Sequence, residues 1–197
     1  MPTESEALAM SMIEMMANKA ASHSYVSGTY YEAVISNDHT YRYKLTRQWG
    51  RQAGSRVCWI MLNPSTADGL KDDKTISKIM RYSKRWGYHA LDVVNLFAFR
   101  ATDPKRLNNP QYPLQIVGIE NDPWIADTVK QADCVIAAWG KHGRLYGREH
   151  SVLKLIRDLG QKYAPPVCYL KLNNDGTPAH PLYLKDTLAP QKWKAYE

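Results

Sequence analysis

Four short apolar runs, each followed by polar residues, organise the pattern of hydrophobic positions along the chain. The first run covers residues 57–62 and stops at Asn63-Pro64, where the proline cannot donate to a strand ladder. An apolar run of this length between turn residues is typical of a buried strand in a parallel sheet. The same pattern predicts three further strands, at residues 90–97, 134–139 and 167–172.

Segments with a helical spacing of apolar residues separate these runs. Residues 75–86 and 120–132 predict two helices, and a third helix is expected to end near residue 159. Strands that alternate with helices favour a mainly parallel sheet with helices on both faces. We therefore expect an α/β fold with three layers, α/β/α, around a mainly parallel four-stranded central sheet.

The first fifty residues follow a different pattern. Apolar residues at helical spacing predict an amphipathic helix over residues 4–21, and a loop follows at 22–28. Residues 29–35 and 41–49 are rich in Tyr, Val and Thr, and the turn residues 36–39 separate them. This pattern predicts a β-hairpin before the first central strand.

Length and charge limit the organisation and the partners of the protein. The 197 residues fit one domain, which we place at 29–197, after an N-terminal helix and loop at 1–28. The chain carries 26 Lys and Arg against 19 Asp and Glu, and this net charge of +7 favours a polyanionic partner such as DNA. No stretch of the sequence has the length and apolarity of a membrane span or the pattern of a signal peptide. We expect a cytoplasmic monomer without membrane contact.

The cysteine and carboxylate residues suggest that the protein needs no metal. Cys58, Cys134 and Cys168 lie in apolar surroundings without a Cys-x-x-Cys spacing, which is typical of buried thiols in a reducing compartment. An Asp-rich loop precedes the helix at 75–86, but no Glu or His supports a metal site there. We expect Asp72 or Asp73 to cap that helix, and we expect neither a metal nor a cofactor.

Polar side chains lie at or just beyond the ends of the apolar runs. Asn63 follows the first run, Asn95 lies inside the second, the pair Lys141-His142 follows the third, and His180 comes after the fourth. In open α/β sheets, ligands bind beyond the carboxyl ends of the strands, so these side chains are candidates for one site. Each also has a simpler interpretation: Asn63 starts a turn, Asn95 ties a strand to a loop, and His180 stabilises a loop.

Short motifs at these strand ends resemble those of the uracil-DNA glycosylase superfamily. Met-Leu-Asn-Pro-Ser at 61–65 looks like the Gly-Ile-Asn-Pro-Gly motif of the mismatch-specific and thymine glycosylases. Val-Asn-Leu at 94–96 and Arg-Ala-Thr at 100–102 are similar to the second strand and the Arg-Pro-Thr loop of that branch. Ala-Trp-Gly at 138–140 resembles a Leu-Trp-Gly strand end, and His-Pro-Leu at 180–182 resembles the terminal His-Pro-Ser motif.

The motifs also depart from those of the superfamily. Met61 and Ser65 replace the two glycines of the first motif, and Leu182 stands where the terminal motif has Ser. Residues 62–68 are also similar to a less characterised bacterial and phage family marked by Leu-Asn-Pro-Ser-x-Ala-Asp. These departures fit either an altered pocket for a different base or a relative without glycosylase activity.

The resemblance implies a uracil-DNA glycosylase-like fold and a site built from the four motifs. Asn63 would hold a water molecule at the sugar, His180 would donate a hydrogen bond to the departing base, and Asn95 would read the edge of a flipped base. The implied base-binding residues are Leu62, Pro64, Ser65, Asn95 and Trp139. The implied DNA-binding residues are Arg100, Lys141, His142, Arg144 and Arg148.

The leading hypothesis is a monofunctional DNA glycosylase that flips out a modified or mispaired pyrimidine and hydrolyses its N-glycosidic bond. An antiphage role against modified phage bases extends this hypothesis by analogy. Two alternatives stay open: a non-catalytic module that binds nucleic acid or nucleotides, and a phage-related enzyme that modifies nucleotide bases. Formation of an abasic site distinguishes them, because only the glycosylase leaves that product.

Overall fold

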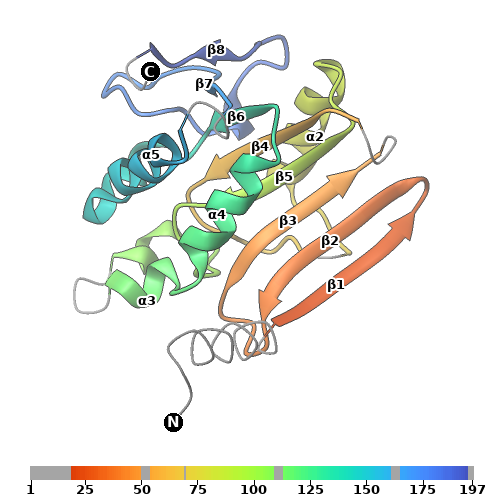
Figure 1. Ribbon diagram of the computed structural model, residues 1–197, viewed down its shortest axis with the longest axis horizontal. Coiled ribbons are helices and arrows are strands. Elements are labelled where there is room, and N and C mark those ends of the chain that lie inside the picture. Colours follow the sequence, from red (N-terminus) through yellow and green to blue (C-terminus); the bar gives the residue numbers. More distant parts are fainter. Residues whose placement is uncertain (1–18, 50–53, 69, 109–112, 161–164, 195–197) are drawn as a thin grey trace.

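The computed structural model describes residues 19–49, 54–68, 70–108, 113–160 and 165–194 of the chain. Its centre is an eight-stranded mixed sheet, and the first and last strands in the sequence form its two edges (Figure 1). The strands are β1 (Lys19–Val26), β2 (Thr29–Ser36), β3 (Arg42–Gln48), β4 (Arg56–Met61), β5 (Ala90–Asn95), β6 (Cys134–Ala137), β7 (Val167–Tyr169) and β8 (Gln191–Lys192). Their order in the sheet is β1-β2-β3-β5-β4-β6-β7-β8.

This sheet shows that the predicted fold, a mainly parallel four-stranded sheet of the uracil-DNA glycosylase type, is wrong. β4 pairs in parallel with β5 and β6, and β6 pairs in parallel with β7. The other four of the seven neighbouring pairs are antiparallel. The main reason is that β3 pairs with β5, with Leu45 opposite Val93 and Gln48 opposite Ala90. The hairpin is therefore part of the main sheet and not an addition to it.

The N-terminal strands confirm one prediction and correct another. β2 and β3 form the predicted hairpin. β1 pairs with β2 along its whole length from Lys19 to Val26, where the sequence suggests the end of a helix and a loop. Backbone pairing forms this strand, since its Ala, Ser and His residues give no alternation of apolar and polar positions. The rest of the predicted helix, residues 4–18, lies outside the described residues.

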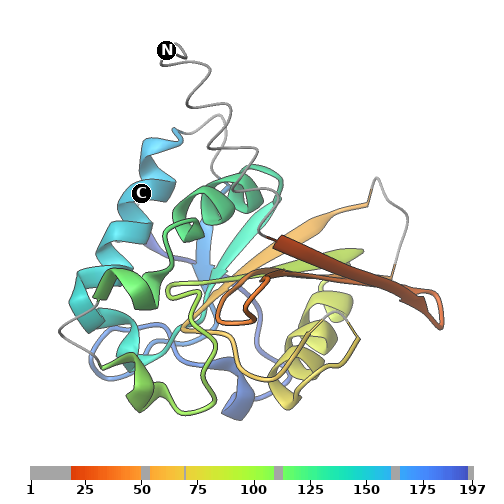
Figure 2. The ribbon, with the colours of Figure 1, turned by 90° about the horizontal axis from the view of Figure 1, so that it is seen from below.

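The described α-helices are α2 (Lys74–Arg85), α3 (Pro113–Val117), α4 (Asn121–Lys130) and α5 (Arg148–Asp158). α2 packs on one face of the sheet, and the other three pack on the opposite face (Figure 2). Three short 3-10 helices lie in loops: η1 (Pro104–Leu107), η2 (Lys141–Gly147) and η3 (Pro181–Tyr183). None of the helices within the described ranges has the length and apolarity to cross a membrane.

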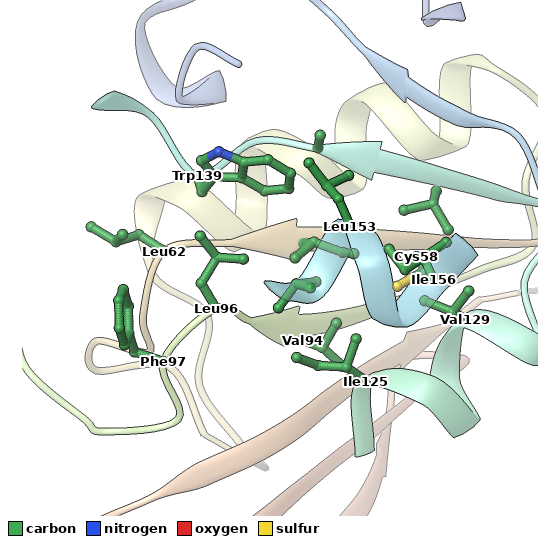
Figure 3. Close-up of a cluster of buried hydrophobic side chains, with 14 of the residues drawn as sticks. Cys58, Leu62, Val94, Leu96, Phe97, Ile125, Val129, Trp139, Leu153 and Ile156 are labelled. Atoms are coloured by element: carbon green, nitrogen blue, oxygen red, sulfur yellow. The ribbon is translucent and has the colours of Figure 1, made fainter. Parts of the chain in front are cut away.

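Alternation along the central strands fills a core on each face of the sheet. Successive side chains of a strand point to opposite faces, so Cys58 of β4 packs with α4 and α5 while Trp59 packs with α2. Figure 3 shows the first of these clusters, with Leu62 and Trp139 near one end. Both side chains are buried, so the polar segments that follow β4 and β6 start from a rigid apolar base.

A buried network of charges joins β3 to the central strands. Asp92 of β5 is fully buried and accepts a hydrogen bond from Nη1 of Arg56 at 2.7 Å. Arg47 of β3 is equally buried; its Nε pairs with Oδ1 of Asp72 at 2.8 Å, and its Nη2 donates to the backbone oxygen of Asp68 at 2.6 Å. Arg47 thus holds the loop that connects β4 to α2.

Candidate functional site

A cavity of about 1150 Å³ lies beyond the carboxyl ends of β4, β5, β6 and β7. Loops that follow these strands form most of its wall, together with the start of α2, residues of η3 and one side chain from β3. Four cationic side chains and two carboxylates line it, which gives the wall a net positive charge: Arg42, Lys74, Lys141, Lys171, Asp73 and Asp175. The predicted gathering of polar residues at this edge of the sheet is confirmed for Asn63, Asn95, Lys141, His142 and His180.

Asn63 stands just after β4 with its amide held in one orientation. Its Nδ2 donates to the backbone oxygens of Ala101 at 2.7 Å and of Pro64 at 3.0 Å. The Pro64 oxygen also accepts from the N–H of Ala101 at 2.9 Å, so the loops after β4 and β5 are tied together. Since the two carbonyls fix the nitrogen, the other end of the amide is Oδ1, which accepts no hydrogen bond from the described residues. This acceptor is available to a molecule in the cavity.

Asn95 ends β5 and lies at the floor of the cavity, with 1% of its surface exposed. Its Oδ1 accepts a long hydrogen bond of 3.4 Å from Nη2 of Arg42, and its backbone oxygen accepts from Nδ2 of Asn121 at 2.9 Å. Within the described part of the chain, Nδ2 of Asn95 has no partner. The amide therefore offers a ligand chiefly a hydrogen-bond donor.

Arg42 of β3 brings a buried positive charge to the cavity. It is 3% exposed, its Nη1 donates to the backbone oxygen of Ala67 at 2.8 Å, and its Nε has no hydrogen-bond partner. Burial lowers the pKa of Arg42 to about 10, and the negative charge of Asp73 opposes this shift. The guanidinium stays charged at neutral pH, and among the described residues no carboxylate forms an ion pair with it. Such a cation favours a ligand that carries or develops negative charge.

His180 precedes η3, and the backbone selects its tautomer. Its Nδ1 accepts from the N–H of Leu182 at 3.4 Å, which places the imidazole proton on Nε2. Burial lowers the pKa of His180 below its ordinary value, and Asp73 opposes this shift. The imidazole is therefore neutral at neutral pH and offers an N–H donor. The loop before it is fastened to the end of β6, because Gly140 N–H donates to the Pro178 oxygen at 2.8 Å.

Asp73 is both a helix cap and a cavity residue. Its Oδ1 accepts from the backbone N–H groups of Thr75 at 2.9 Å and Ile76 at 2.8 Å, which confirms that Asp72 or Asp73 caps this helix. Its Oδ2 has no hydrogen-bond or ion-pair partner in the described ranges. Over the same ranges, no group of three or more His, Cys, Asp or Glu residues is arranged to hold a metal ion.

The residues expected to bind a base reach the cavity in two ways. Leu62, Ser65, Asn95 and Trp139 lie on its wall. Pro64 is buried and contributes through its backbone oxygen, which accepts from Asn63. Trp139 is held in place because its Nε1 donates to Oε2 of Glu149 at 3.0 Å. These contacts make the part of the wall near β4 and β6 rigid.

Gly143 of η2 leaves the space that the Trp139 ring occupies. A Cβ at this position would lie 2.1 Å from Cδ1 and 2.6 Å from Nε1 of Trp139. Gly143→Ala is therefore expected to push the indole away from Glu149 and to lower the free energy of unfolding by about 1–3 kcal/mol. Urea denaturation followed by tryptophan fluorescence measures this loss. An unchanged midpoint and slope would show that the wall accommodates the methyl group.

Three of the residues expected to bind DNA are exposed near the cavity mouth. Lys141 and His142 are exposed at the start of η2 and line the cavity. Arg144 is exposed in the same helix, and its guanidinium donates to the backbone oxygen of Asp175. These three side chains form a polar rim on one side of the cavity.

The other two expected DNA-binding residues have contacts inside the protein. Arg148 is buried; its Nε donates to the backbone oxygen of Leu96 at 2.7 Å, and its guanidinium pairs with Asp122. It therefore braces α5 against the end of β5, and we give it a structural role. Arg100 donates through Nη1 to the backbone oxygen of His39 at 3.2 Å and does not line the cavity.

Sequence reasoning missed Arg42, Asp73 and Tyr183 as residues of the site. Tyr183 is 89% exposed on η3 while it also lines the cavity, so its ring stands at the rim. Tyr183 comes three residues after the candidate His180, and this short spacing could have indicated that both lie at one site. The sequence marks Arg42 only as a basic residue of the predicted hairpin that could contact a phosphate backbone, and its place in the cavity depends on the pairing of β3 with β5. Asp73 was recognised as a cap, and a capping pattern carries no information about a neighbouring cavity.

The fold and the cavity define a protein with a mixed sheet, helices on both of its faces and a cationic candidate ligand site at the carboxyl ends of its parallel strands. The family model described as "Protein of unknown function (DUF1643)" matches residues 42–182, and the chain belongs to this family. No curated protein and no solved structure matches the chain. The matched segment includes Asn63, Asn95 and His180, so the central features of the site lie within the family domain.

Proposed function

We propose that this protein is a monofunctional DNA glycosylase that excises a modified or mispaired pyrimidine and leaves an abasic site. One observation carries the proposal: the free Oδ1 of Asn63 and the Nε2 donor of neutral His180 serve the same cavity. Hydrolysis of an N-glycosidic bond needs a positioned water at the sugar and a donor at the departing base. These two side chains fit the two tasks, and the motif resemblance supports the same reaction class.

In the proposed reaction, the bond between the sugar carbon and the base nitrogen breaks, and its electron pair leaves with the base. The sugar gains positive charge, and the base gains negative charge. His180 donates to a base oxygen as this charge grows, a contribution of about 3–4 kcal/mol for a preorganised donor. The buried cation Arg42 adds favourable electrostatics on the same side and holds Asn95 for contact with the base edge.

The size and charge of the cavity favour DNA with a large modified base. Its volume of about 1150 Å³ exceeds the space that a single pyrimidine ring fills. It lies above the range of about 300–1,000 Å³ that is common for ligand pockets, so a base with a bulky substituent fits. Lys141 and His142 at the mouth are placed to contact phosphates, and the exposed ring of Tyr183 is placed to stack on a base.

We also propose that the protein acts as a monomer in the cytoplasm. The three cysteines are free and buried, which fits a reducing compartment. A role against phage DNA that carries modified bases follows from the proposed substrate class and depends on it.

The direct test of the proposed function is abasic-site formation on a panel of oligonucleotides, with alkali cleavage as the readout. The panel contains uracil, thymine mismatches, and hydroxymethylated and glucosylated cytosine, each in single and double strands. Base-specific cleavage by the wild type, absent in Asn63→Ala, supports the glycosylase. Salt-dependent DNA binding without cleavage of any substrate contradicts it and favours a binding module.

The lowered pKa of His180 predicts a change of stability with pH. The unfolded chain takes up a proton on this side chain as the pH falls through about 6.5, whereas the folded protein resists protonation. The stability that the neutral imidazole provides is therefore present above pH 6.5 and is lost on acidification. Between pH 8 and pH 5, the free energy of unfolding of the wild type should therefore fall by more than that of His180→Gln, as measured by denaturation at both pH values. Equal losses in both proteins would contradict the assigned state of His180.

A further inference from the structure

The proposed reaction leaves one proton without an acceptor. Asn63 can orient the attacking water, but an amide is too weak a base to take a proton from it. Two carboxylates line the cavity, Asp73 and Asp175. Asp175 is exposed at the rim, and its Oδ1 accepts from the N–H of Thr177 at 3.1 Å and from its Oγ1 at 2.7 Å. Asp73 lines the same cavity and is less exposed than Asp175.

The hydrogen bonds of Asp73 leave one of its oxygens free and fix the direction of the group. Two N–H groups at the start of α2 hold Oδ1, so the carboxylate cannot rotate without losing the helix cap. Oδ2 has no partner among the described residues. A cap on the outer surface of a protein is solvated at this oxygen, whereas Oδ2 of Asp73 belongs to a residue that lines a cavity with Asn63 and His180.

Two other groups of the site respond to the charge of Asp73. Its negative charge favours the protonated form of His180 and the charged form of Arg42, so all three belong to one electrostatic unit. Arg42 is more than nine-tenths buried, and its Nε lacks a partner. A buried cation without an ion pair, a carboxylate and a neutral donor that line one cavity are typical of a site where charge separates during a reaction.

We propose that Asp73 is a further catalytic residue, the general base that accepts a proton from the attacking water. This inference rests on the proposed glycosylase function. The water oxygen forms a bond to the sugar carbon while the bond from that carbon to the base breaks, and the electron pair leaves with the base. The proton of the water passes to Oδ2 of Asp73 and is later returned to the base anion. The ionised carboxylate also stabilises the positive charge on the sugar before the proton moves.

The variant Asp73→Asn tests the inference without removing the cap. Asparagine keeps the oxygen that accepts from Thr75 and Ile76 and is as good a cap as aspartate, but it cannot accept a proton. Single-turnover base release is expected to fall by about 100-fold or more, with binding of the same DNA retained. The matched control is Asp103→Asn, because Asp103 caps η1 through the N–H of Lys105 and does not line the cavity. The rate of base release by Asp103→Asn is expected to stay at the wild-type level.

A second variant separates a catalytic role from a structural one. Asp73→Ser keeps a capping oxygen and leaves space for a small carboxylate, so added formate is expected to restore part of its base release. Formate should not restore Asn63→Ala. Wild-type rates in Asp73→Asn, or no effect of formate on Asp73→Ser, would overturn the role of Asp73 while the wild type still cleaves. A wild type that cleaves no substrate of the panel would overturn the proposed function and this inference with it.

Discussion

Asn63→Ala is expected to abolish base release while DNA binding stays largely intact. The substitution removes Oδ1, the one acceptor of the site whose direction is fixed by two hydrogen bonds from its own amide nitrogen. A water that is no longer held at the sugar loses the advantage of a positioned reactant, which costs about 100-fold or more in rate. The measurement is single-turnover cleavage of the best substrate of the panel, compared with the dissociation constant of the same DNA.

The same substitution also removes the contacts of Nδ2 with Pro64 and Ala101, so stability must be measured with activity. These contacts tie two loops together, and their loss is expected to cost about 1–3 kcal/mol. If Asn63→Ala is folded at the assay temperature and binds DNA but releases no base, Asn63 takes part in the reaction. Full activity in that variant would remove Asn63 from the mechanism and would leave His180 as the sole support of the proposal.

The gathering of Asn63, Asn95 and His180 at one cavity follows from the order of apolar runs and polar turns. β4 lies between β5 and β6 and is parallel to both, so the residues after these strands meet at one edge of the sheet. His180 follows β7, and the hydrogen bond from the Gly140 N–H to the Pro178 oxygen holds its loop at the end of β6. The polar residue at the end of any one of these strands is close to the ends of the others.

Arg42 shows why the rest of the site was not predictable. Its side chain reaches Asn95 only because β3 pairs with β5, and a hairpin sequence does not specify which edge of a sheet it joins. The same uncertainty explains the wrong fold class, because the antiparallel pairing of β3 with β5 makes the hairpin part of the central sheet, which is therefore mixed. β1 was missed for a related reason: its side chains have no strand pattern, and its partner β2 supplies the hydrogen bonds.

Arg47→Ala is expected to cause the largest loss of stability, about 3–5 kcal/mol in the free energy of unfolding. The guanidinium is fully buried, pairs with Asp72 at 2.8 Å, donates to the backbone oxygen of Asp68 at 2.6 Å and lies 4.5 Å from the ring centre of Tyr31. Alanine leaves the carboxylate without its partner and opens a cavity beneath the loop between β4 and α2. Urea denaturation followed by circular dichroism measures the change.

Arg81→Ala is the matched control, because Arg81 of α2 is 60% exposed and lies 3.8 Å from Asp186 at the surface. This substitution is expected to lower the free energy of unfolding by less than about 0.5 kcal/mol. A loss below 1 kcal/mol for Arg47→Ala would show that the loop holds itself without the arginine. If the loss is large, base release should fall as well, even under conditions where the variant is folded. Arg47 supports the segment that ends at Asp73, so a loosened loop would move the proposed base away from the water that it must deprotonate.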